Sequence, residues 1–289
     1  MKNKITLKTI LMLFLVGIIV ASSSNINAQQ NNKYGMLSFN KAVNISGKQR
    51  MLSQKMAKTY LYLIDNPSDV KAKRDLLTSK IIFEKQNEII LQNSSYKVTK
   101  DRVAKVKSIW TSFESIISTP ANFDNAKKII ELNTDLLKAT NSVVSAIIVE
   151  SKGVVQGDIS LLEDDGYGES DTELKQIINM AGRQRMLAQR LGLYYFANQN
   201  TLKDKNSEQM LTNVFNELDG AITVLLISNF NNSKIDEKLG LAMTKWEQVK
   251  MNKEKLMNQG FKASEIYSIS NDLTKAFNTV TGLYEKVKM

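Results

Sequence analysis

The 289-residue chain contains no cysteine and no histidine, and it has only two prolines and two tryptophans. Without cysteine there is no disulfide, no lipid-modified N-terminal cysteine and no thiol nucleophile. Without histidine as well, zinc, copper and haem lose their usual protein ligands, and Ser-His catalysis is unavailable. Because these absences exclude most enzyme classes, we expect no enzymatic activity, no cofactor and no metal site.

The first 28 residues have the pattern of a secretory signal peptide. Three lysines precede an apolar run from Thr9 to Ala21, and Ala28 ends a short segment that suits a cleavage site. The apolar run is too short for a comfortable transmembrane helix, and an uncleaved N-terminal anchor is the alternative interpretation. No later stretch approaches 18 uninterrupted apolar residues. The mature chain is therefore predicted to be periplasmic or secreted and not to span a membrane.

The formal net charge is +10 at pH 7. A basic surface suits a nucleic acid, an acidic membrane or a small anionic ligand. Export argues against nucleic acid as a partner. Because lysines are spread along the predicted helices, we interpret most of the excess charge as solvated surface.

One segment of the chain occurs twice. The sequence VNISGKQRMLSQKMA at residues 43–57 returns as INMAGRQRMLAQRLG at residues 178–192. Further along, Trp110 returns as Trp246, and DLLKATN at 135–141 returns as DLTKAFN at 272–278. The offset drifts only slightly, as small loop insertions would cause. A unit of about 120 residues has therefore been duplicated, and each copy has the size of one domain.

Helical periodicity dominates both copies, and strand alternation is absent. Helices are predicted at about 37–64, 69–91, 99–117, 120–155, 172–198, 203–228, 234–258 and 261–287. Ser68 is expected to cap the second helix, and the two prolines fall near helix starts. Four helices with short connections, occurring twice, predict an all-α protein built of two tandem four-helix bundles.

The predicted domain boundaries follow from this pattern. They are a signal peptide at 1–28, a first bundle at 35–156, a linker at 157–170 and a second bundle at 171–289. The acidic linker contains the carboxylate pair Glu163 and Asp165, but it lacks the donor spacing of a calcium loop and any indication of a catalytic pocket.

The repeated helix has two packing faces rather than one. At 100° per residue, one face carries Val43, Gly47, Arg50, Gln54, Ala57 and Leu61, and the other carries Ile45, Leu52, Met56 and Leu63. The glycine allows another backbone to approach closely. A buried arginine on that face must be paired. The face therefore predicts a partner that is helical and negative, or a helix together with a small anion, and the two copies are able to serve each other.

The residues alone leave two interpretations of Arg50 and Arg185 open. Residues 43–64 and 174–203 contain no Asp or Glu, so neither arginine has a carboxylate on its own helix. One interpretation is a structural salt bridge with a carboxylate from another helix. The other is a site for a small anion. The two tryptophans and the methionines of the motif are interpreted as core residues.

The pattern Asn-x-x-Gly-x-x-Arg-Met, at residues 44–51 and 179–186, resembles a known sensor domain. It is similar to the PilJ-type domain, the N-terminal domain of type IV pili methyl-accepting chemotaxis proteins, which is related to the sensor module of nitrate/nitrite kinases. Copy 1 departs from the pattern at Ser46 and Lys48, and copy 2 has Ala188 where copy 1 has Ser53. The resemblance covers nearly all of the predicted mature chain.

The resemblance implies a four-helix bundle that pairs through its first helix, with the motif arginines of two modules meeting one planar anion. It implies Arg50 and Arg185 as anion contacts and the motif glycines as close-approach positions. Within this chain the second bundle would replace a dimer partner and form an intramolecular pseudo-dimer, and a homodimer of two chains is the alternative. The candidate ligand-binding residues are Arg50, Arg185, Gly47, Gly182, Gln54 and Gln189.

We therefore expect an exported, non-enzymatic sensor or binding protein for a small oxyanion such as nitrate or nitrite. Because family members usually drive signalling domains, a separate envelope receptor or a pilus or chemotaxis protein is the expected partner. The alternative is a structural or protein-interaction module of the cell envelope, which uses the same helix face for partner contacts and binds no small ligand.

Overall fold

The computed structural model describes residues 33–152, 170–199, 202 and 206–288. All of them belong to one compact unit that extends from residue 33. The predicted signal peptide and residues 157–169 of the predicted linker lie outside the described residues. Their boundaries stay predictions.

The described chain is all-α apart from one short hairpin, so the predicted fold class is confirmed. Strand β1 (Lys33–Tyr34) pairs in an antiparallel manner with β2 (Leu37–Ser38). The first bundle follows with α2 (Phe39–Asp65), α3 (Val70–Asn93), α4 (Lys97–Ile117) and α5 (Phe123–Glu150). The second bundle contains α6 (Ser170–Ala197), α7 (Ser207–Leu226), α8 (Ser233–Met251), α9 (Lys253–Met257) and α10 (Ala263–Tyr284).

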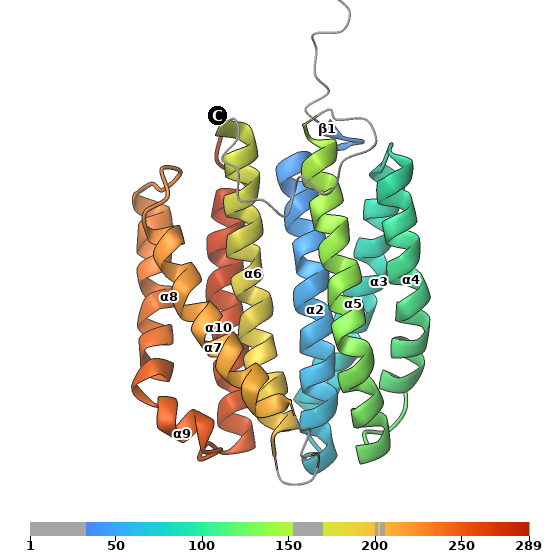
Figure 1. Cartoon of the computed structure of the whole chain (residues 1–289), viewed down its shortest axis with the longest axis vertical. Helices are drawn as coiled ribbons and strands as arrows, with labels where there is room; N and C mark the ends of the chain where they lie inside the picture. Colours follow the sequence, from blue (N-terminus) through green and yellow to red (C-terminus); the bar gives the residue numbers. More distant parts are fainter. Residues whose placement is uncertain (1–32, 153–169, 200–201, 203–205, 289) are drawn as a thin grey trace, which may run out of the picture. The chain divides into compact units, whose positions relative to one another are not determined.

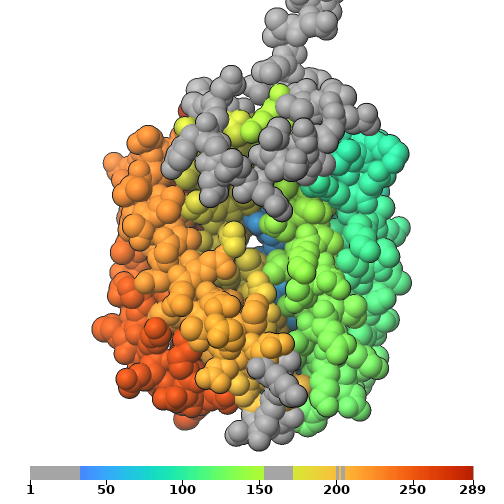
Figure 2. All heavy atoms as spheres, viewed as in Figure 1, coloured from blue at the N-terminus to red at the C-terminus, as the bar shows by residue number. Residues whose placement is uncertain are grey.

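The first helices of the two bundles, α2 and α6, lie side by side (Figure 1). Their mutual packing is the most extensive between any two helices in the described part of the chain. In each bundle the first helix packs against the second and fourth helices, and the third packs on the fourth. Little of α2, drawn in blue, is visible between its neighbours in the space-filling view (Figure 2). The repeated helices therefore form the interior of the structure.

Both predicted faces of α2 are buried. Gly47, Arg50 and Gln54 point toward one set of neighbours, while Leu52 and Met56 belong to the hydrophobic core. A helix with two buried faces requires neighbours on both sides. The second bundle supplies the neighbour that a single four-helix bundle lacks.

The two tryptophans occupy equivalent core positions, as predicted. Trp110 is 8% exposed and Trp246 is 2% exposed. Each indole Nε1 donates to a carboxylate on the second helix of its bundle, Glu84 at 3.4 Å and Asp219 at 2.8 Å. These equivalent pairs confirm the register of the duplication beyond the repeated motif.

Several helix ends differ from the sequence prediction. Asp69, and not Ser68, caps α3, because its side chain accepts a hydrogen bond from Ala72 N. Asn122 caps α5, which begins three residues after Pro120. The predicted helix 234–258 is divided at Asn252 into α8 and α9.

The hairpin before α2 was not predicted. Its turn contains Gly35, whose positive φ of 59° suits glycine. The structure contains no helix, among the residues it describes, that is long and apolar enough to cross a membrane.

Candidate functional site

The motif glycines lie where α2 and α6 approach each other, and both motif arginines reach this point. A Cβ built on Gly47 would lie 3.3 Å from Arg185 Nη2 and 3.4 Å from Arg50 Nη2. A Cβ built on Gly182 would lie 2.9 Å and 3.7 Å from the same two atoms. The two Nη2 groups therefore converge on a narrow space between the glycines, which we call the arginine seam.

Arg50 crosses from α2 to the second bundle. Its Nη2 donates to the side-chain oxygen of Asn179 at 2.6 Å and to the backbone oxygen of the same residue at 3.3 Å. Its Nη1 donates to Asn141 Oδ1 on α5 at 2.7 Å. Its Nε is buried and has no hydrogen-bond partner within the described structure.

Arg185 makes the equivalent contacts from α6. Its Nη1 donates to Asn44 Oδ1 on α2 at 2.7 Å and to Asn278 Oδ1 on α10 at 3.1 Å. Its Nη2 reaches the backbone oxygen of Asn44 at 3.4 Å, and its Nε reaches Gly182 O at 3.5 Å. Each arginine is thus held by one asparagine from its own bundle and one from the other bundle.

No carboxylate forms an ion pair with either arginine in the described part of the chain. Glu285 lies nearby, but it accepts a hydrogen bond from the Asn44 side-chain amide. The interpretation of Arg50 and Arg185 as members of structural salt bridges therefore has no acidic partner to support it among the described residues. Neutral amide oxygens take the place that a carboxylate would have occupied.

Both guanidiniums are removed from solvent, with Arg50 2% exposed and Arg185 0% exposed. Burial lowers the pKa of each from 12.5 to about 9. The charge of Arg183 adds to this effect on the pKa of Arg50, and the charge of Arg50 lowers the pKa of Arg185 further. Both side chains are still cations at pH 7, so two positive charges face one space.

The seam is buried along α2 and α6, but it ends close to solvent. Asn141 and Asn278, which hold the outer Nη1 groups of the arginines, are exposed. The outer end of each guanidinium therefore lies next to an exposed side chain.

The glutamines one turn away are bound elsewhere. Gln54 exchanges two hydrogen bonds with Asn133 on α5, at 2.8 Å and 3.1 Å. Gln189 donates to Thr274 Oγ1 at 2.7 Å and to Asn271 Oδ1 at 3.1 Å on α10. The structure thus brings together the predicted glycines and arginines, and it places both glutamines against the fourth helix of their own bundle.

Sequence reasoning assigned no role to the four asparagines that hold the arginines. The signal was present, because Asn44 recurs as Asn179 and Asn141 recurs as Asn278. It also missed Lys58, which is fully buried on α2 one turn beyond Gln54. Within the described structure there is no group of three or more side chains able to hold a metal ion.

One known domain family matches the chain. The family described as the N-terminal domain of type IV pili methyl-accepting chemotaxis transducers matches residues 35–129 and 169–270. The two stretches fall in the two bundles, include both seam arginines and together cover more than half of the chain. Neither a curated protein nor a solved structure matches.

Proposed function

Because the chain belongs to the family of type IV pili methyl-accepting chemotaxis transducer N-terminal domains, we propose that it is an exported, non-enzymatic sensor that binds a small oxyanion in the arginine seam. The family consists of sensor modules and not of catalytic domains. The anion and its place between Arg50 and Arg185 are our inference from the geometry of α2 and α6.

The observation that carries this proposal is a pair of buried guanidiniums that form no ion pair with a carboxylate of the described residues. Two like charges that face one space removed from water repel each other. Asparagine oxygens solvate the guanidiniums but do not cancel their charge. An anion between the two Nη2 groups would turn this repulsion into two attractions. It would also supply an acceptor near Arg50, whose Nε has no hydrogen-bond partner among the described residues.

The space selects for a small ligand. A single added carbon at Gly182 already meets Arg185 Nη2 at 2.9 Å, so any anion requires the guanidiniums to move, and a small anion requires the smaller movement. Guanidiniums prefer planar oxygen acceptors, which they contact through two parallel hydrogen bonds. A planar monovalent oxyanion, such as nitrate or nitrite, fits both requirements better than a tetrahedral divalent anion.

Binding in the seam would change how α2 and α6 pack. The Nη2 groups now contact Asn179 and Asn44 across the seam, and an anion between them competes with these contacts. A ligand shifts an equilibrium only if it interacts differently with two states. Here the free state has asparagine-bound arginines and the bound state has anion-bound arginines. We propose that a separate envelope receptor, or a pilus or chemotaxis protein, detects the difference.

The alternative function uses the same helix face for a separate protein partner. This face is covered in the folded chain, because Gly47 and Arg50 lie against α6 and Gly182 and Arg185 lie against α2. A partner at this face would first have to separate the bundles. The geometry therefore favours the anion.

The test is a thermal-shift and calorimetric titration of the mature protein with nitrate, nitrite, chloride and sulfate. We expect a saturable rise in melting temperature with the planar oxyanions, because a ligand at about 100 times its Kd stabilises the folded state by about 2.7 kcal/mol. The Arg50→Met/Arg185→Met variant should lose the response.

Arg74→Met/Lys105→Met is the matched control, because it removes the same number of positive charges from exposed positions of α3 and α4. If the wild-type protein and the seam variant respond alike to every anion, the proposed site is wrong. A response that follows ionic strength alone in all three proteins would contradict it equally.

A further inference from the structure

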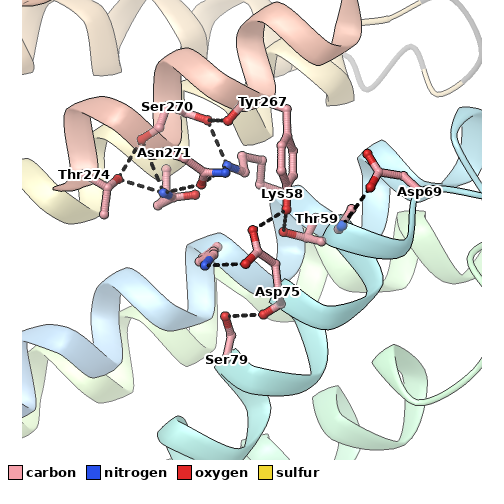
Figure 3. Close-up of polar contacts among 12 residues, drawn as sticks. Lys58, Thr59, Asp69, Asp75, Ser79, Tyr267, Ser270, Asn271 and Thr274 are labelled. Carbon is pink, nitrogen blue, oxygen red and sulfur yellow. Dashed lines mark hydrogen bonds and ion pairs between the residues drawn. The ribbon is translucent and has the colours of Figure 1, made fainter.

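Lys58 is buried, at a position where a protonated lysine lowers the free energy of unfolding unless its amine is hydrogen-bonded. It is 0% exposed and projects from α2 toward α10 of the second bundle. Its Nζ lies 2.8 Å from Ser270 Oγ, 2.8 Å from Asn271 Oδ1 and 4.3 Å from the ring centroid of Tyr267 (Figure 3). Two oxygens and an aromatic face give three acceptors, which is the number that an ammonium group requires.

The second repeat has no equivalent of this contact. At the offset of the repeated motif, Lys58 corresponds to Leu193, and the segment offset near α10 makes Ser270 correspond to Asn133. In the first bundle Asn133 is paired with Gln54. The shorter Ser270 leaves space in the second bundle, and Lys58 reaches Ser270 Oγ.

A glycine on α6 completes this space. A Cβ built on Gly192 would lie 2.7 Å from Lys58 Cδ and 3.0 Å from Ser270 Oγ. The corresponding residue of the first repeat is Ala57. The lysine, the serine and the glycine thus differ from the other repeat together, as expected if the second bundle has been shaped around this amine.

Lys58 is connected to the arginine seam by hydrogen bonds. Asn271 Oδ1 accepts from Lys58 Nζ and from Gln189 Nε2. Gln189 also donates to Thr274 Oγ1, which contacts the backbone oxygen of Arg185 at 3.3 Å. One turn further along α10, Asn278 accepts from Arg185 Nη1. A change at Lys58 therefore acts on α10, which carries the Asn278 acceptor of Arg185.

The charged surroundings of Lys58 come from several helices. On its own helix Lys55 faces it, on α3 Asp75 faces it, and on α10 the phenol of Tyr267 donates to Asp75 Oδ2 at 3.0 Å. On α6 its neighbour is the uncharged Gly192. Burial lowers the pKa of Lys58 well below its ordinary value, Lys55 lowers the pKa further, and Asp75 raises it. Asp75 is itself engaged, because it forms an ion pair with Lys55 at 3.5 Å.

We propose that Lys58 is a proton-linked latch that holds α10 of the second bundle to α2 of the first and sets the position of Arg185, but not of Arg50. The protonated amine fills all three acceptors and adds a third buried positive charge near the seam. The neutral amine gives up one of these contacts and removes that charge. The latch acts on the arginines whether or not an anion is bound.

The sign of the pH effect follows from the lowered pKa. An amine whose pKa is lower in the folded than in the unfolded protein costs folding free energy when it is protonated. Its contribution to stability is therefore greatest above the unfolded pKa, decreases as the pH falls from the unfolded pKa to the folded pKa, and is lowest below the folded pKa. Proton uptake in the folded state should also raise the affinity of the seam for any anion.

The test is a side-chain NMR titration from pH 5 to pH 10 without added oxyanion, on protein carrying ¹³C-lysine and ¹⁵N-arginine. We expect the Lys58 Cε signal to titrate with a midpoint well below about 10.4, the value of a solvated lysine. The Arg185 side-chain signals should shift with the same midpoint, while those of Arg50 stay constant. Lys58→Met should abolish the Arg185 shift.

Lys58→Leu introduces the residue found at the corresponding position 193 and should abolish the Arg185 shift in the same way. Should both variants fail to fold, Ser270→Ala removes one acceptor and should move the Lys58 midpoint further down. The proposal is wrong if the Lys58 signal titrates with the midpoint of a solvated lysine. It is also wrong if the Arg185 signals do not shift at the Lys58 midpoint, or if the Arg50 and Arg185 signals shift equally. Because no oxyanion is added, failure of the latch and failure of the anion site are separate results.

Discussion

Arg50 and Arg185 hold equivalent positions in the two repeats, but their surroundings become different one turn away. At the seam the asparagines match pair by pair, since Asn44 and Asn179 have the same role on opposite helices. Beyond it, Gln54 pairs with Asn133 on α5, whereas Gln189 faces Thr274 and Asn271 on α10. The residues that meet at the seam have kept their identity, whereas the residues on the fourth helices that hold the two glutamines have diverged.

The two arginines are also satisfied to different degrees. Among the described residues, Arg185 Nη1 has two asparagine acceptors and its Nε has a weak one, whereas Arg50 Nη1 has one acceptor and its Nε has none. The Arg50 half of the seam therefore depends on fewer contacts. It also has more to gain from an added acceptor. The following substitutions test this difference between the halves.

The largest difference is expected between the two seam glycines. Gly182→Ala places a carbon 2.9 Å from Arg185 Nη2, and Asn44 and Asn278 hold the same guanidinium in place through its Nη1. We expect a loss of about 2 kcal/mol in the free energy of unfolding. Gly47→Ala meets the arginines only at 3.3 Å and 3.4 Å, and its clash should nearly cancel the gain in helix propensity of about 1 kcal/mol.

Urea denaturation measures both values. Gly220→Ala on α7 is the control, because nothing lies within 4 Å of its Cβ and only the propensity gain remains. Equal losses at Gly47 and Gly182 would show that the seam is less tight on the Gly182 side than the structure indicates.

A smaller difference is expected between the outer asparagines. Asn141→Ala removes the one acceptor described for Arg50 Nη1. It should lower the free energy of unfolding by about 1–2 kcal/mol, because Asn141 is exposed and water can partly replace the lost acceptor. Asn278→Ala should cost less than about 1 kcal/mol, because Asn44 still accepts from Arg185 Nη1. Urea unfolding curves of the two variants measure both free energies, and the substitution is the same at equivalent positions of the two repeats. A larger loss for Asn278→Ala would reverse our ranking of the two halves.

Supplying the missing carboxylate should also affect the halves differently. Asn179→Asp places a carboxylate against Arg50 Nη2, so we expect a gain of about 1 kcal/mol and loss of the anion response. Asn44→Asp places a carboxylate against Arg185 Nη1 but also against Glu285, so it should stabilise the protein less than Asn179→Asp does. Melting temperatures with and without nitrate report both effects. A full nitrate response in Asn179→Asp would argue against a ligand between the arginines.

The smallest effects are expected at the tryptophan–carboxylate pairs. The indole of Trp246 and the ammonium of Lys250 lower the pKa of Asp219. Its stabilising contribution is therefore present above the unfolded pKa and lost as the pH falls through the folded pKa. Asp219→Asn should cost less than about 1 kcal/mol at pH 7, because the carboxylate is partly exposed, and nothing in strong acid.

Glu84→Gln is the matched change in the first bundle. It should cost less at pH 7, because the Trp110 indole lies 3.4 Å from the carboxylate against 2.8 Å in the second bundle. Urea midpoints between pH 2 and pH 7 distinguish the two variants. A cost for Asp219→Asn that does not change with pH would mean that the carboxylate acts through packing alone.

Much of the fold followed from the repeat. The doubled motif predicted two helical bundles, and the two faces of its helix left open whether the copies meet each other or a second chain; in the structure the copies meet. These features depend on periodicity and on glycine spacing, which are local in sequence. The hairpin and the cap at Asp69 were missed, because they depend on which of several adjacent polar residues finds a partner.

The candidate site was predicted less completely. Gly47, Gly182 and the two arginines converge, but Gln54 and Gln189 face the fourth helices. Helical periodicity gives the direction of a side chain, and it does not reveal which helix is met there. Lys58 was missed for the same reason, since nothing in its own segment shows that Ser270 and Gly192 make room for it.

The two halves of the seam belong to one polypeptide, and this has a consequence for concentration. Two modules on different chains dissociate on dilution. Two modules on one chain keep a fixed local concentration, which is in general about millimolar for short flexible linkers. The pairing of α2 with α6 should therefore be independent of how much of the protein the cell makes. A sensor of this kind keeps the same response at low and high abundance.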